Sequence, residues 1–165
     1  MLRKPRAVYF DMDGTIADLY GVEGWLDYLH AEDTTPYDNA LPMVDTLMFN
    51  DLVMLLQSMG IRVGVISWAA KNSREGYKKA VANAKKAWIK KHVPAVNEVH
   101  VVAYGSPKHR HANVKNDVIL FDDDMRVRKS WDNEEKGRIS VDPSEIISFM
   151  ADLANLAVRE YNNGR

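Results

Sequence analysis

Four short apolar runs are the feature of this sequence that most constrains its fold. Most of them lack a clean alternation of apolar and polar residues, which is typical of strands covered on both faces, as in a parallel sheet. Because helical patterns separate the runs, we predict an open α/β sheet with right-handed crossovers. The strands are expected at residues 7–10, 62–66, 99–103 and 118–121, with a weaker one at 138–141.

The helical patterns carry signals of their own. Helices are expected at residues 24–30, 44–59, 74–92 and 144–161. In the third of these, Asn72 followed by Glu75 is a possible N-terminal cap, and Pro94 ends the helix. The apolar residues of that segment repeat at the spacing of one helix face, at Tyr77, Val81, Ala84 and Trp88.

Residues 16–60 are too elaborate for a simple crossover. They contain a short amphipathic piece, then a turn-rich loop through Thr34, Thr35, Pro36, Asp38 and Asn39, before the crossover helix. We predict a small cap or flap in this region. The length of 165 residues fits one domain that comprises residues 1–165 and includes this insertion.

Composition narrows the possible chemistry. The chain has no cysteine, which excludes disulfides, thiol catalysis and thiolate metal sites. No apolar run approaches the roughly 20 residues of a membrane span, and the N-terminal apolar stretch is too short for a signal-peptide core. We therefore expect a cytoplasmic protein that does not enter a membrane.

Positive charge is concentrated in one part of the chain. The net charge is −1, yet residues 71–115 carry eleven Lys or Arg and two Glu. Such a segment can form a surface for phosphate-rich ligands, nucleic acid included, or the solvated face of a lysine-coated helix. The sequence leaves both interpretations open.

Polar and acidic residues follow three of the expected strands. Asp11 and Asp13 follow the first, Ser67 the second, and the acidic run 122–124 the fourth. In an open α/β sheet, the carboxyl ends of the strands form the binding edge, so these groups are expected to converge there. Several carboxylates in one place require a divalent cation, and oxygen ligands favour Mg²⁺.

Four segments, "DMDGT", "VGVIS", "YGSPK" and "LFDDD", occur in this order within residues 7–124. Together they resemble the signature elements of the haloacid dehalogenase superfamily of aspartate-nucleophile phosphatases. The resemblance implies a Rossmann-like sheet with strand order 3-2-1-4-5, helices on both faces, and a small helical cap after the first strand.

The resemblance also implies roles for individual residues. Asp11 would attack phosphorus to form an aspartyl-phosphate, and Asp13 would protonate the leaving oxygen and later activate water. Thr15 would orient Asp13 beside the phosphate, and Ser67 would hydrogen-bond a phosphate oxygen.

A magnesium site follows from the same resemblance. Mg²⁺ would be held by the Asp11 carboxylate, the Asp13 backbone carbonyl and Asp123, with Asp122 in support. Asp124 fits the pattern less well and is expected to be a loop residue or a helix cap.

One lysine is needed to balance the phosphate dianion against these acids. Lys108 of "YGSPK" is the preferred candidate, and Lys85 of "KKAWIKKH" is the alternative. In a helix that begins at Asn72, Lys85 lies about 20 Å along the axis, which favours Lys108.

Within the superfamily, the chain looks most similar to the 5'(3')-deoxyribonucleotidases and to the phosphatase domain of polynucleotide kinases. We expect a nucleotide phosphomonoesterase, with Trp25, Tyr28 or Trp68 available to stack on a base, although Trp25 and Tyr28 fit core packing better. The alternative is a 3'-phosphatase on polynucleotide ends that uses residues 71–115 and "KHRH" as a phosphate track. His109 and His111 are expected to be solvated.

A different class also gathers acids, a hydroxyl and a lysine on an α/β sheet, namely the phosphoacceptor receiver domain. Such domains accept phosphate on the third strand, whereas the third strand here ends "VVAYG" without an acid. A phosphate-binding module without catalysis is the other non-enzyme alternative.

Overall fold

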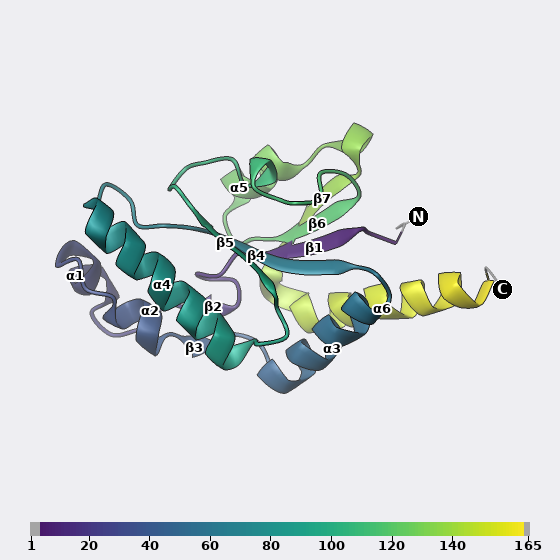
Figure 1. Cartoon of the computed structure of the whole chain (residues 1–165), viewed down its shortest axis with the longest axis horizontal. Helices are drawn as coiled ribbons and strands as arrows, with labels where there is room; N and C mark the ends of the chain where they lie inside the picture. The colour runs from purple at the N-terminus through teal and green to yellow at the C-terminus, as the bar shows by residue number, and fades with distance from the viewer. Residues whose placement is uncertain (1–3, 164–165) are drawn as a thin grey trace.

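A computed structural model of the chain describes residues 4–163. Within this range, five parallel strands form one open sheet (Figure 1). From one edge to the other, the strands are β5 (Glu98–Val102), β4 (Arg62–Trp68), β1 (Ala7–Phe10), β6 (Val118–Phe121) and β7 (Arg138–Val141). This order confirms the predicted arrangement of the five strands. β4 extends two residues beyond its predicted end, and β5 begins and ends one residue early.

β1 is the middle strand of the sheet. Phe10 lies opposite Val65 of β4 and Phe121 of β6. Because the parallel strands end at the same level, Asp11 emerges next to Asp122, and the Asp11 backbone N–H donates to the carbonyl of Phe121 at 2.8 Å. The register of β1 and β6 therefore brings the two acidic segments together.

Burial on both faces explains why β1 shows no alternation. Val8 and Phe10 point into one core cluster, whereas Ala7 and Tyr9 point into another. α3 (Thr46–Ser58), α4 (Glu75–His92) and α6 (Ile146–Asn163) contribute to the first cluster. α5 (Met125–Trp131) covers the opposite face.

The start of α4 corrects one sequence prediction. The helix begins at Glu75 with Arg74 as its N-cap, so the predicted cap at Asn72 is wrong. Asn72 has a φ of 48° and forms part of a turn. Asparagine tolerates this left-handed conformation, so Asn72 serves the connection between β4 and α4 instead.

The insertion after β1 is compact. β2 (Ala17–Asp18) and β3 (Leu41–Pro42) pair antiparallel at its base, and α1 (Trp25–His30) and α2 (Thr35–Asn39) lie between them. α2 occupies the segment predicted to be a turn-rich loop. A proline in its first turn is compatible with a helix start, because its fixed φ is already helical.

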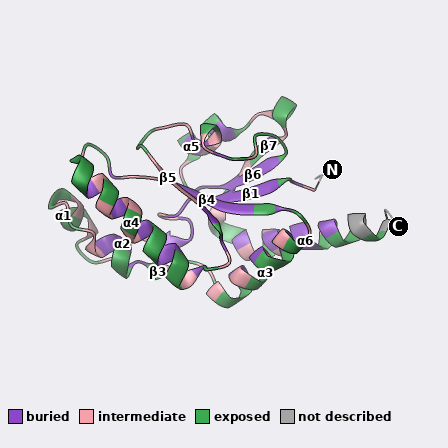
Figure 2. Ribbon diagram, in the orientation of Figure 1, coloured by how far each residue is buried: buried purple, intermediate pink, exposed green. Residues whose placement is uncertain are grey.

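The insertion packs along α4 from the start of the helix to Trp88, whose Nε1 donates to the carbonyl of Ala40 at 2.7 Å. Arg74 forms an ion pair with Glu32, and the Tyr77 hydroxyl donates to the carbonyl of Asp33 at 3.0 Å. α1 itself contributes no fully buried residue; Trp25 and Leu29 are half-buried and its other residues are exposed (Figure 2). The insertion is therefore held mainly through α2 and the segment that joins the two helices.

Short helical segments complete the fold. They are η1 (Lys108–Arg110), η2 (Glu134–Lys136) and η3 (Pro143–Glu145). Asp124 caps α5 by accepting the backbone N–H of Arg126 at 2.8 Å, which confirms one of its two predicted roles. α5 is absent from the predicted elements because seven residues are too few to show a helical period. Among the helices of residues 4–163, none is both long and apolar enough to span a membrane.

Candidate active site

The segment after β1 turns sharply at the binding edge of the sheet. The carbonyl of Met12 accepts the backbone N–H groups of Thr15, Ile16 and Ala17 at 3.2, 3.0 and 2.9 Å. Gly14 has a φ of 73°, and a Cβ at this position would lie 2.6 Å from Asp123 Oδ2. Glycine thus permits both the turn and the close approach of Asp123.

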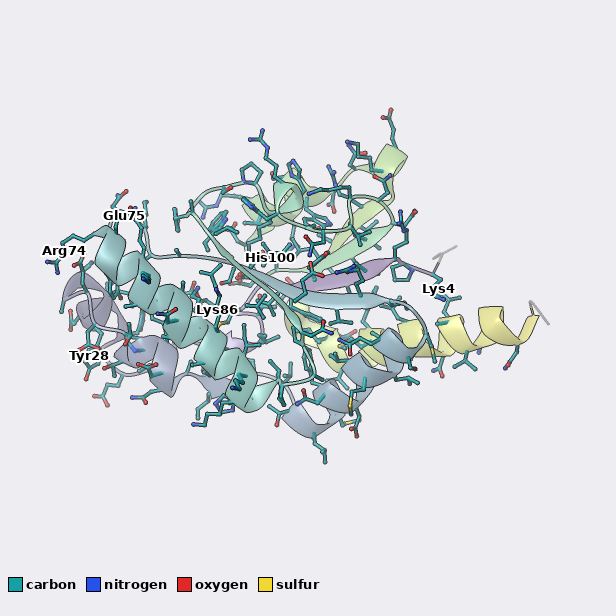
Figure 3. All side chains as sticks on the ribbon, viewed as in Figure 1. Lys4, Tyr28, Arg74, Glu75, Lys86 and His100 are labelled. Atoms are coloured by element: carbon teal, nitrogen blue, oxygen red, sulfur yellow. The ribbon has the colours of Figure 1, made fainter. Side chains whose placement is uncertain are left out.

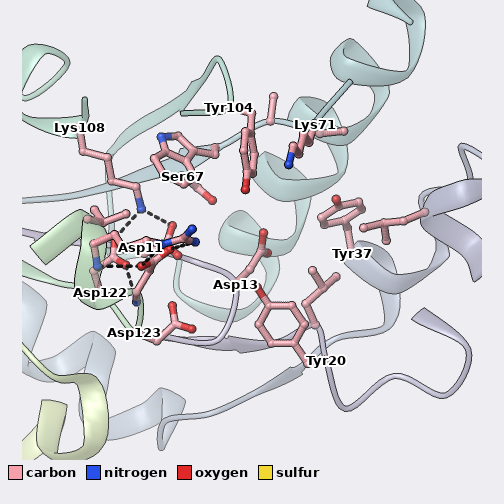
Figure 4. A pocket seen from close by; sticks show the side chains of 18 of the residues that line it. Asp11, Asp13, Tyr20, Tyr37, Ser67, Lys71, Tyr104, Lys108, Asp122 and Asp123 are labelled. Atoms are coloured by element: carbon pink, nitrogen blue, oxygen red, sulfur yellow. Dashed lines mark hydrogen bonds and ion pairs between the residues drawn. The ribbon is translucent and has the colours of Figure 1, made fainter. Parts of the chain in front are cut away.

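The acids of β1 and β6 meet as predicted. Carboxylate oxygens of Asp11, Asp122 and Asp123 lie within 4.8 Å of one another. Lys108 Nζ lies 2.7 Å from Asp11 Oδ1 and 2.7 Å from Asp122 Oδ2 (Figure 4). Burial, followed by the negative charge of Asp11, raises the pKa of Asp122 to about 7. The ammonium group of Lys108 therefore lies between two carboxylates that would otherwise repel each other.

The cluster has the composition of a hard-cation site. Asp122 uses Oδ2 for Lys108 and Oδ1 for the backbone N–H of Asp124, which lies 2.9 Å away. Both oxygens of Asp122 are thus occupied, so the oxygens that could bind a cation belong to Asp11 and Asp123. Mg²⁺ prefers such oxygen ligands, and the lack of a side chain at Gly14 leaves room for the Asp123 carboxylate beside the turn. The residues present thus fit a magnesium ion.

Lys108 reaches the site from the connection between β5 and β6, where η1 carries it. Tyr9 anchors this connection, because its hydroxyl accepts the backbone N–H of Asn113 at 3.0 Å and donates to Glu98 at 2.8 Å. Trp68 Nε1 also donates to the carbonyl of Ser106 at 2.9 Å. The position of Lys108 therefore depends on contacts that lie far from it in sequence.

Asp13 points into the same pocket from the turn after β1. Lys85 Nζ lies 2.6 Å from Asp13 Oδ2, whereas Oδ1 is buried and has no hydrogen-bond partner among the described residues. Burial raises the pKa of Asp13, the charge of Lys85 opposes this effect, and the charge of Asp11 adds to it. The net upward shift of the pKa favours the protonated carboxyl more than at an exposed aspartate.

Lys85 is the main surprise of the site. The prediction that it lies far away assumed that α4 points its first turn at the site, but the helix passes with its middle alongside. Lys85 is 1% exposed and also donates to Ser67 Oγ at 2.9 Å and to the carbonyl of Trp68 at 2.7 Å. The sequence did contain a sign that Lys85 is buried. It lies between Val81 and Trp88 on the apolar stripe of α4, where a charged residue needs a partner.

The two hydroxyl residues are both buried. Ser67 is 1% exposed and lies within β4, one residue before the strand ends. The Thr15 hydroxyl contacts Asp123 Oδ1 at 3.4 Å, so it lies at the acid cluster instead of orienting Asp13. Both residues thus belong to the site, but the partner of Thr15 differs from the predicted one.

Aromatic side chains surround the acids. The pocket has a volume of about 530 Å³. Trp68 and Tyr104 lie on one side with ring centroids 4.9 Å apart, and Tyr20 and Trp25 pair at 5.1 Å. Its aromatic lining consists of Tyr20, Trp25, Tyr37, Trp68 and Tyr104.

Two predictions about aromatic residues of α1 are wrong. Trp25 lines the pocket instead of packing in a core, and Tyr28 is exposed. The reason is that α1 buries no residue fully, although the spacing of these two residues is that of a core-facing helix. Trp68, by contrast, lies next to Ser67 as expected.

The basic segment divides between the site and the surface. Lys85 and Lys108 turn inward, and Lys78 pairs with Glu75 at 2.7 Å. His109 and His111 are half-buried instead of solvated, and neither belongs to the acid cluster. Lys71 is exposed but also lines the pocket. The remaining basic residues of the segment are exposed: Arg74, Lys79, Lys86, Lys90, Lys91, Arg110 and Lys115.

Comparison with known proteins establishes the fold. No protein-family model matches the sequence, and no curated protein matches it. The structure is similar to D,D-heptose 1,7-bisphosphate phosphatase from Burkholderia thailandensis, with a TM-score of 0.54 and 15% identity over 89% of this chain and 97% of that chain. It also matches an uncharacterized protein from Corynebacterium glutamicum, with a TM-score of 0.49 and 13% identity over 92% of this chain and 94% of that chain. The first likeness confirms the predicted Rossmann-like α/β fold.

Proposed function

We propose that this protein is a magnesium-dependent phosphomonoesterase of the haloacid dehalogenase type. The observation that carries the proposal is the acid cluster of Asp11, Asp122 and Asp123, with Lys108 between two of its carboxylates. A solved structure of the same fold is named as a phosphatase, which supports this activity. A receiver-like or purely phosphate-binding module is a weaker alternative, because Asp13 supplies a proton-transfer group that binding alone does not need.

The reaction has two steps. An Asp11 carboxylate oxygen attacks phosphorus, the bond from phosphorus to the leaving oxygen breaks, and Asp13 gives that oxygen a proton. Water then attacks the aspartyl-phosphate and gives a proton to Asp13. The bond between phosphorus and Asp11 breaks, and inorganic phosphate leaves. Asp11 and Asp13 are both restored at the end of the cycle.

Charge balance gives the other residues their roles. Asp11 and Asp123 would hold Mg²⁺, together with the Asp13 backbone carbonyl and with support from Asp122; the ion would neutralise phosphate charge. Lys108 adds a positive charge that is worth about 4 kcal/mol at 4 Å and an effective dielectric near 20. The Ser67 hydroxyl would donate to a phosphate oxygen, and Thr15 would support the site through Asp123.

We propose a nucleotide as the substrate. The pocket volume of about 530 Å³ suits a small molecule, since ligand pockets measure roughly 300–1,000 Å³. The Trp68 and Tyr104 rings lie beside Ser67, where a base could stack once the phosphate is bound. The insertion after β1 would act as a small cap over this pocket, within a single domain.

The second candidate substrate is a 3'-phosphorylated polynucleotide end. Lys71, an exposed lysine that lines the pocket, favours this possibility, because it could contact a phosphate of a strand that extends out of the pocket. Turnover of deoxynucleoside monophosphates and of a 3'-phosphorylated oligonucleotide, measured over a range of salt concentrations, separates the two. Exclusive, strongly salt-dependent turnover of the oligonucleotide would overturn the nucleotide assignment.

The activity itself is tested with p-nitrophenyl phosphate and Mg²⁺. We expect hydrolysis by the wild-type protein and none by Asp11→Asn, which lacks the nucleophile. Asp51→Asn removes the charge of an exposed aspartate on α3 and should keep full activity. Hydrolysis that survives Asp11→Asn would contradict the mechanism.

A further inference from the structure

The site contains two buried lysines, and they contact different acids. Lys108 lies between Asp11 and Asp122, whereas Lys85 pairs with Asp13. The neutralising role assigned above to Lys108 leaves Lys85 without a function. Burial of an ammonium group is expensive unless it is paired and hydrogen-bonded, so the contacts of Lys85 require an explanation.

All three N–H donors of Lys85 have an acceptor. They are Asp13 Oδ2 at 2.6 Å, Ser67 Oγ at 2.9 Å and the carbonyl of Trp68 at 2.7 Å. The Tyr37 ring from the insertion lies 5.2 Å from the same ammonium group and helps to exclude water. An ammonium group held at three points can in turn hold Asp13 and Ser67 in one orientation.

The two oxygens of Asp13 are in different situations. Oδ2 is bound by Lys85, whereas Oδ1 is buried and has no partner among residues 4–163. Buried carboxylate oxygens without a partner are rare, because each one costs free energy. Oδ1 is therefore the oxygen of Asp13 whose missing hydrogen bond a group of the substrate would supply.

We propose that Lys85 is a positioning residue that fixes Asp13 through Oδ2, so that Oδ1 faces the leaving oxygen, and that also orients the Ser67 hydroxyl. This role rests on the proposed phosphatase function. Lys85 itself does not touch phosphorus or the leaving group; it acts through Asp13.

The role predicts a dependence on the leaving group. p-Nitrophenolate leaves without a proton, whereas the more basic phenolate and alkoxides need one in the first step. kcat/KM reports events up to formation of the aspartyl-phosphate, so it isolates that step from the later attack of water. A misplaced Asp13 should therefore lower kcat/KM most for the most basic leaving groups.

The experiment measures kcat/KM for a series of substituted phenyl phosphates and one alkyl phosphate. Lys85→Met removes the donor, and Lys85→Arg keeps the buried charge but moves the donor group. Lys86→Met, the next residue on α4, is exposed and serves as the matched control (Figure 3). Thermal unfolding of every variant is recorded alongside.

General acids contribute roughly 10²–10⁴-fold, so Lys85→Met should lose about 10²-fold with the alkyl phosphate and less than about tenfold with p-nitrophenyl phosphate. Lys85→Arg should show the same trend with a smaller slope, and it decides the matter if Lys85→Met does not fold. Lys86→Met should resemble the wild type.

A double variant adds an independent check. In an Asp13→Asn background, replacement of Lys85 should no longer change the leaving-group dependence, because the group that it positions is gone. Equal losses for all leaving groups in the folded Lys85 variants would overturn the proposal and leave the phosphatase function intact. Absence of hydrolysis by the wild type and by Lys86→Met would overturn the proposed function itself.

Discussion

Lys108 Nζ lies 2.7 Å from Oδ1 of Asp11, a residue 97 positions earlier in the sequence, in a region where both side chains are almost fully enclosed. The same ammonium group contacts Asp122. Burial opposes its charge, but Asp11 and Asp122 outweigh that effect and raise the pKa of Lys108. The proposed nucleophile is thus paired with a cation that stays charged at neutral pH.

Replacement of this cation should abolish most of the activity. In Lys108→Gln, Asp11 and Asp122 face each other and the phosphate without compensation, and a charge worth about 4 kcal/mol predicts a loss of roughly 10²–10³-fold. The loss is measured as the rate of p-nitrophenyl phosphate hydrolysis by the variant relative to the wild type. Lys79→Gln, an exposed change on α4, is the control, and comparable activity in the two variants would contradict the role.

The magnesium requirement should depend on Asp123. Asp123→Asn removes a charged oxygen from the cluster, so half-maximal activity should need about tenfold more Mg²⁺ or higher. This concentration is measured by titrating Mg²⁺ into protein that has been treated with EDTA. Asp124→Asn is the matched control, since Asp124 caps α5 and asparagine is an equally good cap. An unchanged requirement in Asp123→Asn would exclude this residue as a ligand.

Two glycine substitutions should act in opposite directions. Gly14→Ala places a Cβ 2.6 Å from Asp123 Oδ2 at a φ of 73°, so we expect loss of activity and a lower unfolding temperature. Gly76→Ala lies in α4 with no atom within 4 Å of the new Cβ and should raise stability by about 0.5–1 kcal/mol. Activity assays and thermal unfolding distinguish the two, and a fully active Gly14→Ala would show that the turn can relax.

Low pH should weaken the contact between Tyr9 and Glu98, which holds the β5–β6 connection in place. Burial alone would raise the pKa of Glu98, but hydrogen bonds from His100, Tyr9 and Arg62 outweigh it and lower the pKa below 4.5. The ionised Glu98 therefore stabilises the fold above about pH 4.5, and this contribution is lost as the pH falls through the lowered value.

Urea unfolding of Glu98→Gln tests this pH dependence. The variant should be less stable than the wild type at pH 7, and the difference should shrink in acid. Glu135→Gln, at an exposed position in η2, controls for the change of net charge. A difference that is independent of pH would assign the effect of Glu98 to packing instead of charge.

Several sequence predictions follow from local properties and are confirmed. Residues 7–10 and 118–121 are apolar without alternation, and the structure covers both faces of these strands. The acids directly after them had to lie at the carboxyl edge of a parallel sheet. The proximity of Asp11 to Asp122 and Asp123 was therefore predictable once the strand order was assumed.

The position of Lys85 was not predictable in the same way. A helical period identifies which residues share a face of α4, but not how the helix crosses the sheet. That path is set by packing against α2 and the sheet, and it brings the middle of the helix to Asp13. A lysine on the apolar stripe was the one local sign of this arrangement.

The sequence by itself thus determined where the strands lie and which acids end them, because burial on both faces and parallel register leave a pattern in consecutive residues. Only the tertiary structure decided that Lys85 reaches Asp13, that Thr15 contacts Asp123, and that α1 buries no residue fully. These relations depend on how separate elements pack, and packing between distant segments leaves no periodic signal in either one.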